Sequence, residues 1–240
     1  MNDHPKHNPR LRQTVIVAVC VLAVLLFLYL LLRDRPGSAS DYLDDSAPYT
    51  FDSSASRTFR TVDSRLAVVS SSGLQLLDEN GKTVLHEIFT LSQPGISVSG
   101  ERVCAYDIGG TALYVLDETG PRLELTSDGP LVSANLNGSG MLAVTTQISG
   151  TKGHVDVYGA DMQVLFAFNA HRRFVADACV TEDGGYLAAV TMGQADSVFI
   201  SNLVIYDLTQ EDPVADYSVP DGLVTVSYTH LRAHETDQYL

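Results

Sequence analysis

Four short stretches decide the fold of this chain: RLAVV at residues 65–69, RVCAY at 102–106, MLAVT at 141–145 and YLAAV at 186–190. Each is almost continuously apolar, which is typical of a strand covered on both faces. From the second residue of one stretch to the second residue of the next, the chain advances by 37, 39 and 45 residues. A period near 40 in an all-strand pattern predicts a β-propeller built from four-stranded blades. An open β-sandwich uses similar strands but requires no fixed period, so we favour the propeller.

Turn signals and further strands recur at the same places in each unit. Glycine-containing turns precede three of the four stretches, at residues 98–101, 136–140 and 180–185. They predict hairpins, because glycine adopts the positive φ that tight turns demand. A second apolar strand is predicted after each stretch, at residues 74–78, 113–117, 154–158 and 203–207. The chain is therefore expected to be all-β, with about four blades.

An uncharged apolar run, TVIVAVCVLAVLLFLYLLL, occupies residues 14–32. As a helix rising 1.5 Å per residue it would extend roughly 28 Å, which matches a hydrocarbon core of about 30 Å. A cleavable signal peptide is the alternative, since Ser-Ala-Ser at 38–40 resembles a weak cleavage site. Because the run is longer than the apolar region of an ordinary signal peptide, we favour an uncleaved transmembrane helix.

The flanks of this run predict its orientation. Lys6, Arg10 and Arg12 precede it, whereas Arg33 and Arg35 follow it. Basic residues favour the cytoplasmic side, so we expect a cytoplasmic N-terminus and a propeller outside the cell membrane. After the run, a segment rich in Ser, Asp, Pro and Gly predicts a flexible stalk.

The C-terminal end departs from the blade pattern. Residues 222–226 look like the first strand of a fifth blade, but SYTHLRAHET at 227–236 resembles a translated sequencing-adapter tail. His230 and His234 with Glu235 would share a helix face and could bind zinc, yet we place no metal site in a foreign tail. If the tail is foreign, we expect the native chain to continue with two to four more blades. The predicted organisation is a cytoplasmic tail (1–13), a transmembrane helix (14–32), a flexible stalk (33–56), about four blades plus the first strand of a fifth (57–226), and a non-native tail (227–240).

Composition and charge exclude one class of partner. The chain has 15 Lys and Arg against 29 Asp and Glu, a formal net charge of −14 at pH 7. Nucleic-acid binding needs clustered Lys and Arg, so we expect no nucleic-acid partner. Cys20 lies in the apolar run, and Cys104 and Cys179 lie in strand-like runs. For these last two we favour buried, unpaired thiols over a disulfide.

Candidate chemical motifs are few. GISVS at 95–99 begins like a nucleophile elbow, but Ser99 stands where the last glycine belongs, so we interpret it as a turn. GTKG at 150–153 is interpreted as a flexible hairpin tip and the aspartates of 41–45 as a solvated stalk. His-Arg-Arg at 171–173 could bind a carboxylate or phosphate, although a solvated loop paired with nearby acids is the favoured interpretation. We therefore assign no catalytic, cofactor-binding or metal-binding residue.

Over residues 10–226 the chain resembles bacterial membrane-anchored, WD40-like β-propeller proteins that form a family of unknown function. The resemblance rests on the basic tail, single span, Ser/Asp-rich stalk and repeated Leu-Ala-Val and Val-Tyr-Asp strands; the chain has no Trp, so the Trp-Asp signature is absent. It implies an extracytoplasmic binding or scaffold module whose partner is an envelope protein or wall polymer. The alternatives are an enzyme with its site in missing blades or in the central channel, and the sensory ectodomain of a membrane complex.

Overall fold

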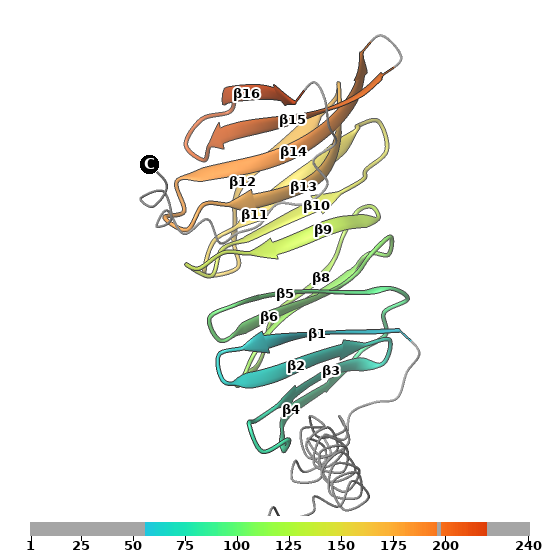
Figure 1. Ribbon diagram of the computed structural model, residues 1–240, viewed down its shortest axis with the longest axis vertical. Helices are drawn as coiled ribbons and strands as arrows, with labels where there is room; N and C mark the ends of the chain where they lie inside the picture. The colour runs from blue at the N-terminus through green and yellow to red at the C-terminus, as the bar shows by residue number, and fades with distance from the viewer. Residues whose placement is uncertain (1–55, 196–197, 220–240) are drawn as a thin grey trace, which may run out of the picture. The chain divides into compact units, whose positions relative to one another are not determined.

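The computed structural model describes residues 56–195 and 198–219, and every regular element in these residues is a β-strand (Figure 1). The first sheet holds β1 (Arg57–Val62), β2 (Arg65–Ser70), β3 (Gly73–Leu77) and β4 (Thr83–Ile88), and the second holds β5 (Pro94–Ser99), β6 (Arg102–Asp107), β7 (Ala112–Asp117) and β8 (Gly120–Thr126). The third holds β9 (Leu131–Leu136), β10 (Leu142–Thr146), β11 (Gly153–Tyr158) and β12 (Val164–Ala170), and the fourth holds β13 (Phe174–Val180), β14 (Tyr186–Ala195), β15 (Val198–Asp207) and β16 (Pro213–Val219). We call these sheets blades 1 to 4. The expected all-β fold class is confirmed.

Within each blade the four strands pair in sequence order and are all antiparallel. The four apolar stretches that set the period are the second strands β2, β6, β10 and β14, as predicted. The predicted turns before them also form: Gly100 and Gly140 adopt φ values of 55° and 80° there. The described architecture therefore consists of short hairpins, with one four-stranded blade for each sequence repeat.

The hydrophobic core lies between neighbouring blades. One cluster joins blades 1 and 2 through residues such as Val69, Leu74 and Leu116, and a second joins blades 2 and 3 through residues such as Leu136 and Tyr158. A third cluster joins blades 3 and 4. Since each inner blade is covered on both faces, its second strand is buried along most or all of its length, which explains the continuous apolar pattern.

Polar contacts between blades supplement this core. Arg102 of blade 2 donates hydrogen bonds to the backbone carbonyls of Gly140 and Ala160, both at 2.9 Å. Asn137, which is 1% exposed, donates to the carbonyl of Thr181 at 2.8 Å and so links blade 3 to blade 4. These bonds satisfy backbone groups at the turns, which are otherwise costly to bury.

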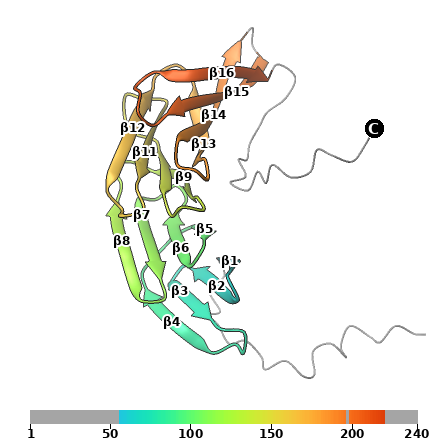
Figure 2. The same cartoon turned by 90° about the vertical axis from the view of Figure 1, so that its left-hand side faces the viewer.

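Antiparallel pairing sorts the loops to two ends of each blade. The turns after the first and third strands lie at one end, and the loop after the second strand and the connection to the next blade lie at the other. We call this second end the connection face. The first and fourth strands are the two edges of each blade, and Figure 2 shows β4, β8 and β12 along the side opposite to β1, β5, β9 and β13. Asp107 stabilises the connection before β5 by accepting hydrogen bonds from the backbone nitrogens of Ser92, at 2.8 Å, and Gln93, at 2.6 Å.

One sequence interpretation is wrong. Residues 95–99 are not a turn but most of strand β5, which pairs with β6. Gly95 is needed there because the Tyr106 ring lies against its backbone, where a side chain would collide. Cys104 and Cys179 are both buried, as expected, and burial raises the pKa of the Cys104 thiol.

Several predictions concern residues outside the described ones: the transmembrane helix at 14–32, the stalk up to residue 55, the fifth-blade strand at 222–226 and the tail with His230, His234 and Glu235. Within residues 56–195 and 198–219 there is no helix with the length and hydropathy needed to cross a membrane.

Candidate functional site

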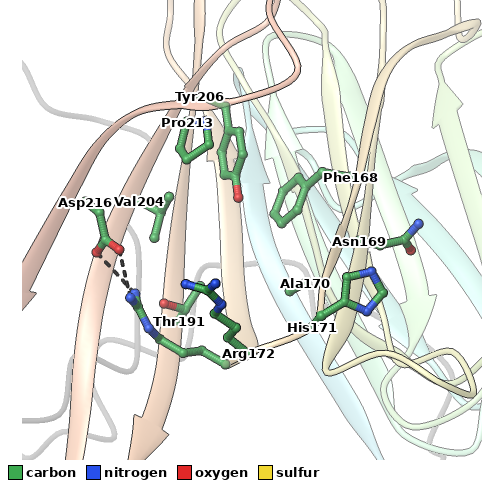
Figure 3. A pocket seen from close by; sticks show the side chains of 11 residues that line it. Phe168, Asn169, Ala170, His171, Arg172, Thr191, Val204, Tyr206, Pro213 and Asp216 are labelled. Atoms are coloured by element: carbon green, nitrogen blue, oxygen red, sulfur yellow. Dashed lines mark hydrogen bonds and ion pairs between the residues drawn. The ribbon is translucent and has the colours of Figure 1, made fainter.

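A pocket of about 300 Å³ lies between blades 3 and 4, next to the connection that joins them. The connection from β12 to β13 supplies His171, Arg172 and Arg173, which are the basic cluster noted in the sequence (Figure 3). Other lining residues include Phe168 of β12 and, from blade 4, Thr191, Tyr206 and Asp216. We call this pocket the basic groove.

The loop of the preceding hairpin, β10–β11, stabilises the connection that carries the basic residues. The backbone nitrogen of Lys152 donates to the carbonyl of Ala170 at 2.7 Å, and that of Val175 donates to the carbonyl of Lys152 at 3.3 Å. The Lys152 ammonium group also lies 4.3 Å from the centre of the Phe174 ring. The motif at 150–153 is thus the end of a hairpin, as predicted, and it fixes the backbone on both sides of the cluster.

Arg173 is already paired within the protein. Its guanidinium donates two hydrogen bonds to the Asp216 carboxylate, of 3.1 and 2.8 Å, and Asn202 donates a third at 2.7 Å. The bonds from Arg173 lower the pKa of Asp216, and the same bonds raise the pKa of Arg173. For Arg173, the expected pairing of the cluster with a nearby acid is therefore found.

The other two basic residues differ. Within residues 56–195 and 198–219, neither His171 nor Arg172 has a hydrogen-bond or ion-pair partner, and both are exposed. Figure 3 shows the Arg172 side chain extending into the groove, on the side of the Arg173–Asp216 pair, with His171 on the opposite side. Arg172 therefore presents its hydrogen-bond donors to whatever enters the groove.

The wall of the groove is aromatic. The rings of Phe168 and Tyr206 stack with centroids 4.3 Å apart, and Phe166 lies 5.9 Å from Tyr206. Burial raises the pKa of Tyr206, so its hydroxyl stays protonated and can donate a hydrogen bond near neutral pH. Thr191 and Val204, each 5% exposed, form the buried part of the lining.

An equivalent pocket of about 310 Å³ lies between blades 2 and 3, and its charge is the opposite. It is lined by Asp128 and by His154 and Asp156 of β11, and we call it the acidic groove. His154 contacts Asp156 at 3.0 Å and Asn169 at 2.9 Å. Asn169 lines both grooves, so the two sites are neighbours across β12.

Taken together, the basic groove can bind an anionic group through Arg172 and pack an apolar group against Phe168 and Tyr206. No group of three or more His, Cys, Asp or Glu side chains in the described part of the chain is placed to hold a metal ion. The sequence indicated the basic cluster but missed Tyr206 and Asp216. The Val-Tyr-Asp pattern of the third strand was a signal for Tyr206, whereas Asp216, 43 residues after Arg173, carried none.

Comparison with solved structures supports the propeller fold. A Kluyveromyces lactis Hsv2 in which loop 6CD is replaced by a Gly-Ser linker matches at 14% identity and a TM-score of 0.53, covering 71% of this chain and 56% of its own. The dihydro-heme d1 dehydrogenase NirN, in complex with DHE, matches at 15% identity and a TM-score of 0.51, with coverages of 68% and 37%. Both are β-propeller proteins. This chain thus spans about half or less of their lengths, and at these identities the likeness concerns the fold alone.

Comparison with curated protein sequences gave no match. A protein family does match, and it covers all four blades: residues 44–224 fit a family of unknown function (DUF5711). The match extends over most of the chain, so this β-propeller protein belongs to that family.

Proposed function

We propose that the protein is a single-pass, membrane-anchored β-propeller, exposed outside the cytoplasm, that acts as a binding or scaffold module of the cell envelope. The apolar run at 14–32 supports the anchor, and the basic residues before it support the orientation. The partner is a protein of the envelope, held on the connection face.

The observation that carries the binding role is the basic groove. It is concave, its wall is aromatic, and Arg172 extends into it without a partner among the described residues. Such a combination of apolar lining and a few converging polar groups is typical of ligand sites. It also lies at loops held by packed sheets, where binding residues of rigid scaffolds are concentrated.

Photo-crosslinking in the native cell tests the binding role. A photoreactive amino acid placed at position 171 should capture an envelope protein, and one at Arg122, on the exposed part of β8, should not capture it. Capture of the same proteins from both positions, or of no protein from position 171, would contradict a binding role for this face.

The three lysines allow a direct test of the orientation. Lys6 precedes the apolar run, whereas Lys82 and Lys152 lie in the blades. A membrane-impermeant amine reagent applied to intact protoplasts should modify Lys82 and Lys152 but not Lys6. Modification of Lys6 alone would show that the orientation is reversed.

We also propose that the native chain continues past residue 226 into further blades. Leu203 of β15, which is 37% exposed, occupies the blade position of Val155 in β11, which is 0% exposed because blade 4 covers it. Tyr217 of β16 is 62% exposed. A further blade would bury this apolar surface. Sequencing the gene beyond this point should reveal more blade repeats, and a genuine stop codon after Leu240 would refute the proposal.

A further inference from the structure

We infer that the basic groove recognises one carboxylate of an acidic side chain in a partner peptide, with an apolar neighbour of that side chain packed on the aromatic wall. This inference rests on the proposed binding role and names the chemistry of the partner.

The charges lining the groove favour a ligand with a single negative charge. Arg172 and Arg173 are positive, Asp216 is negative, and with His171 counted as neutral the lining has a net charge of +1. A carboxylate neutralises this charge. A phosphate carries a charge of about −1.5 to −2, so it would leave an excess of negative charge beside Asp216.

The geometry already present in the groove fits a carboxylate. Arg173 and Asp216 form two parallel bonds, of 3.1 and 2.8 Å, which is the fork arrangement of guanidinium on carboxylate. Arg172, the next residue, presents the same planar group to the groove interior (Figure 3). A ligand carboxylate on Arg172 would repeat this arrangement, and the stacked rings of Phe168 and Tyr206 would cover an adjacent apolar side chain.

The surroundings limit the ligand to a locally acidic, not polyanionic, segment. The chain has a formal charge of −14, and the acidic groove with Asp128 and Asp156 lies directly across β12, sharing Asn169 with the basic groove. A run of acidic residues that reached past Arg172 would meet these carboxylates. One acidic residue flanked by apolar or neutral residues avoids this repulsion.

Fluorescence anisotropy with the full 240-residue chain in a neutral detergent tests the inference. The probe is a fluorescein-labelled peptide, Gly-Phe-Asp-Ser-Gly, and the comparison peptides replace Asp by Asn, by phosphoserine or by three consecutive Asp residues. We expect the Asp peptide to bind about tenfold or more tightly than the Asn peptide, since charge-assisted hydrogen bonds to Arg are lost. The phosphoserine and triple-Asp peptides should bind no more tightly than the single-Asp peptide.

Variants connect this binding to the groove. Arg172→Gln should remove the preference for Asp over Asn, and Arg172→Lys should retain part of it. Arg60→Gln is the matched control, because Arg60 is exposed on β1 and its hydrogen bond goes to the neighbouring Phe59 carbonyl at 3.1 Å. Unchanged circular dichroism of each variant shows that folding is intact.

Each contrary result overturns a defined part of the inference. Equal binding of the Asp and Asn peptides, or an unaffected Arg172→Gln variant, would overturn carboxylate recognition, and tighter binding of phosphoserine or triple Asp would overturn the assignment of a single carboxylate. A crosslink from position 171 to the same envelope protein that persists in a chain also carrying Arg172→Gln would distinguish the binding role from carboxylate recognition. The binding role would then stand and the carboxylate inference would fail.

Discussion

The acidic and basic grooves occupy the same place in successive blades and yet carry opposite charge. In β7–β8, Leu113 pairs with Leu125, and in β11–β12, Val155 pairs with Phe168. Three residues after these partners, Asp128 and His171 therefore hold equivalent positions. The blades determine where a groove forms. Its charge comes from the connection between blades and also from strand residues, which are Asp156 of β11 in one groove and Asp216 of β16 in the other.

The two connections differ in how closely they pack. After Asp128 the chain continues with Gly129 and Pro130, and Gly129 lies so close to the Gln147 carbonyl that a side chain would collide with it. The Gln147 nitrogen also donates to the Pro130 carbonyl at 2.9 Å. In the basic groove, Arg172 and Arg173 occupy the positions equivalent to Gly129 and Pro130. The connection there therefore carries two positive charges. A binding surface can thus change between blades through a few side chains, while the pairing order of the strands stays the same.

The largest expected effect comes from the tyrosine at the equivalent position of each groove, which is Tyr158 in the acidic groove and Tyr206 in the basic groove. Tyr158 pairs with Leu142 and Tyr206 pairs with Leu187, so they are equivalent, but Tyr158 is 7% exposed and Tyr206 is only half-buried. Tyr158→Ala should lower the free energy of unfolding by about 3 kcal/mol and Tyr206→Ala by about half of that. Urea denaturation followed by circular dichroism measures both. Equal losses would show that the two tyrosines are packed alike, contrary to the difference in their exposure.

Reversing one charge should affect binding next most strongly. Arg172→Glu places a negative charge where the carboxylate of the ligand would lie, so affinity for the Asp peptide should fall by about a hundredfold. Asp128→Asn in the acidic groove is the control and should change this affinity little. If both variants weaken binding to the same degree, long-range charge, not the groove, would be responsible.

The two grooves also show what the sequence could and could not predict. Period and hydrophobicity predicted the second and third strands of every blade, because these properties are local and repeat. GISVS at 95–99 misled because glycine and serine are common in turns, whereas Gly95 in fact makes room for the Tyr106 ring across the sheet. The basic cluster at 171–173 could be recognised in the sequence. The pairing of Arg173 with Asp216, however, depends on the register of β13–β16, which a single sequence does not specify.

A smaller effect is expected from His154 in the acidic groove. Its ring joins Asp156, at 3.0 Å, to Asn169, at 2.9 Å, and so connects blade strands β11 and β12. His154→Ala should lower the free energy of unfolding by about 1 kcal/mol, the usual net value of such hydrogen bonds. His154→Gln, which keeps hydrogen-bonding capacity, should recover part of the loss in the same urea titration. A His154→Gln variant as unstable as His154→Ala would assign the effect to packing of the ring.

The smallest effect is the acid dependence of the ion pair in the basic groove. The hydrogen bonds from Arg173, with the bond from Asn202, hold the pKa of Asp216 below its ordinary value of 3.8. A lowered pKa in the folded state stabilises the protein above the unfolded pKa, and this contribution is lost as the pH falls through the folded value. Because the pair is partly exposed, with 30% and 40% of the two side chains accessible, we expect only about 0.5 kcal/mol. Wild type should therefore exceed Asp216→Asn in stability at pH 7, and the gap should narrow as the pH falls below 3.8 and through the lower pKa of the folded protein. A gap that stays constant over this range would mean that Asp216 acts through packing and neutral hydrogen bonds, and the basic groove would then owe its shape to the sheet and not to its charge.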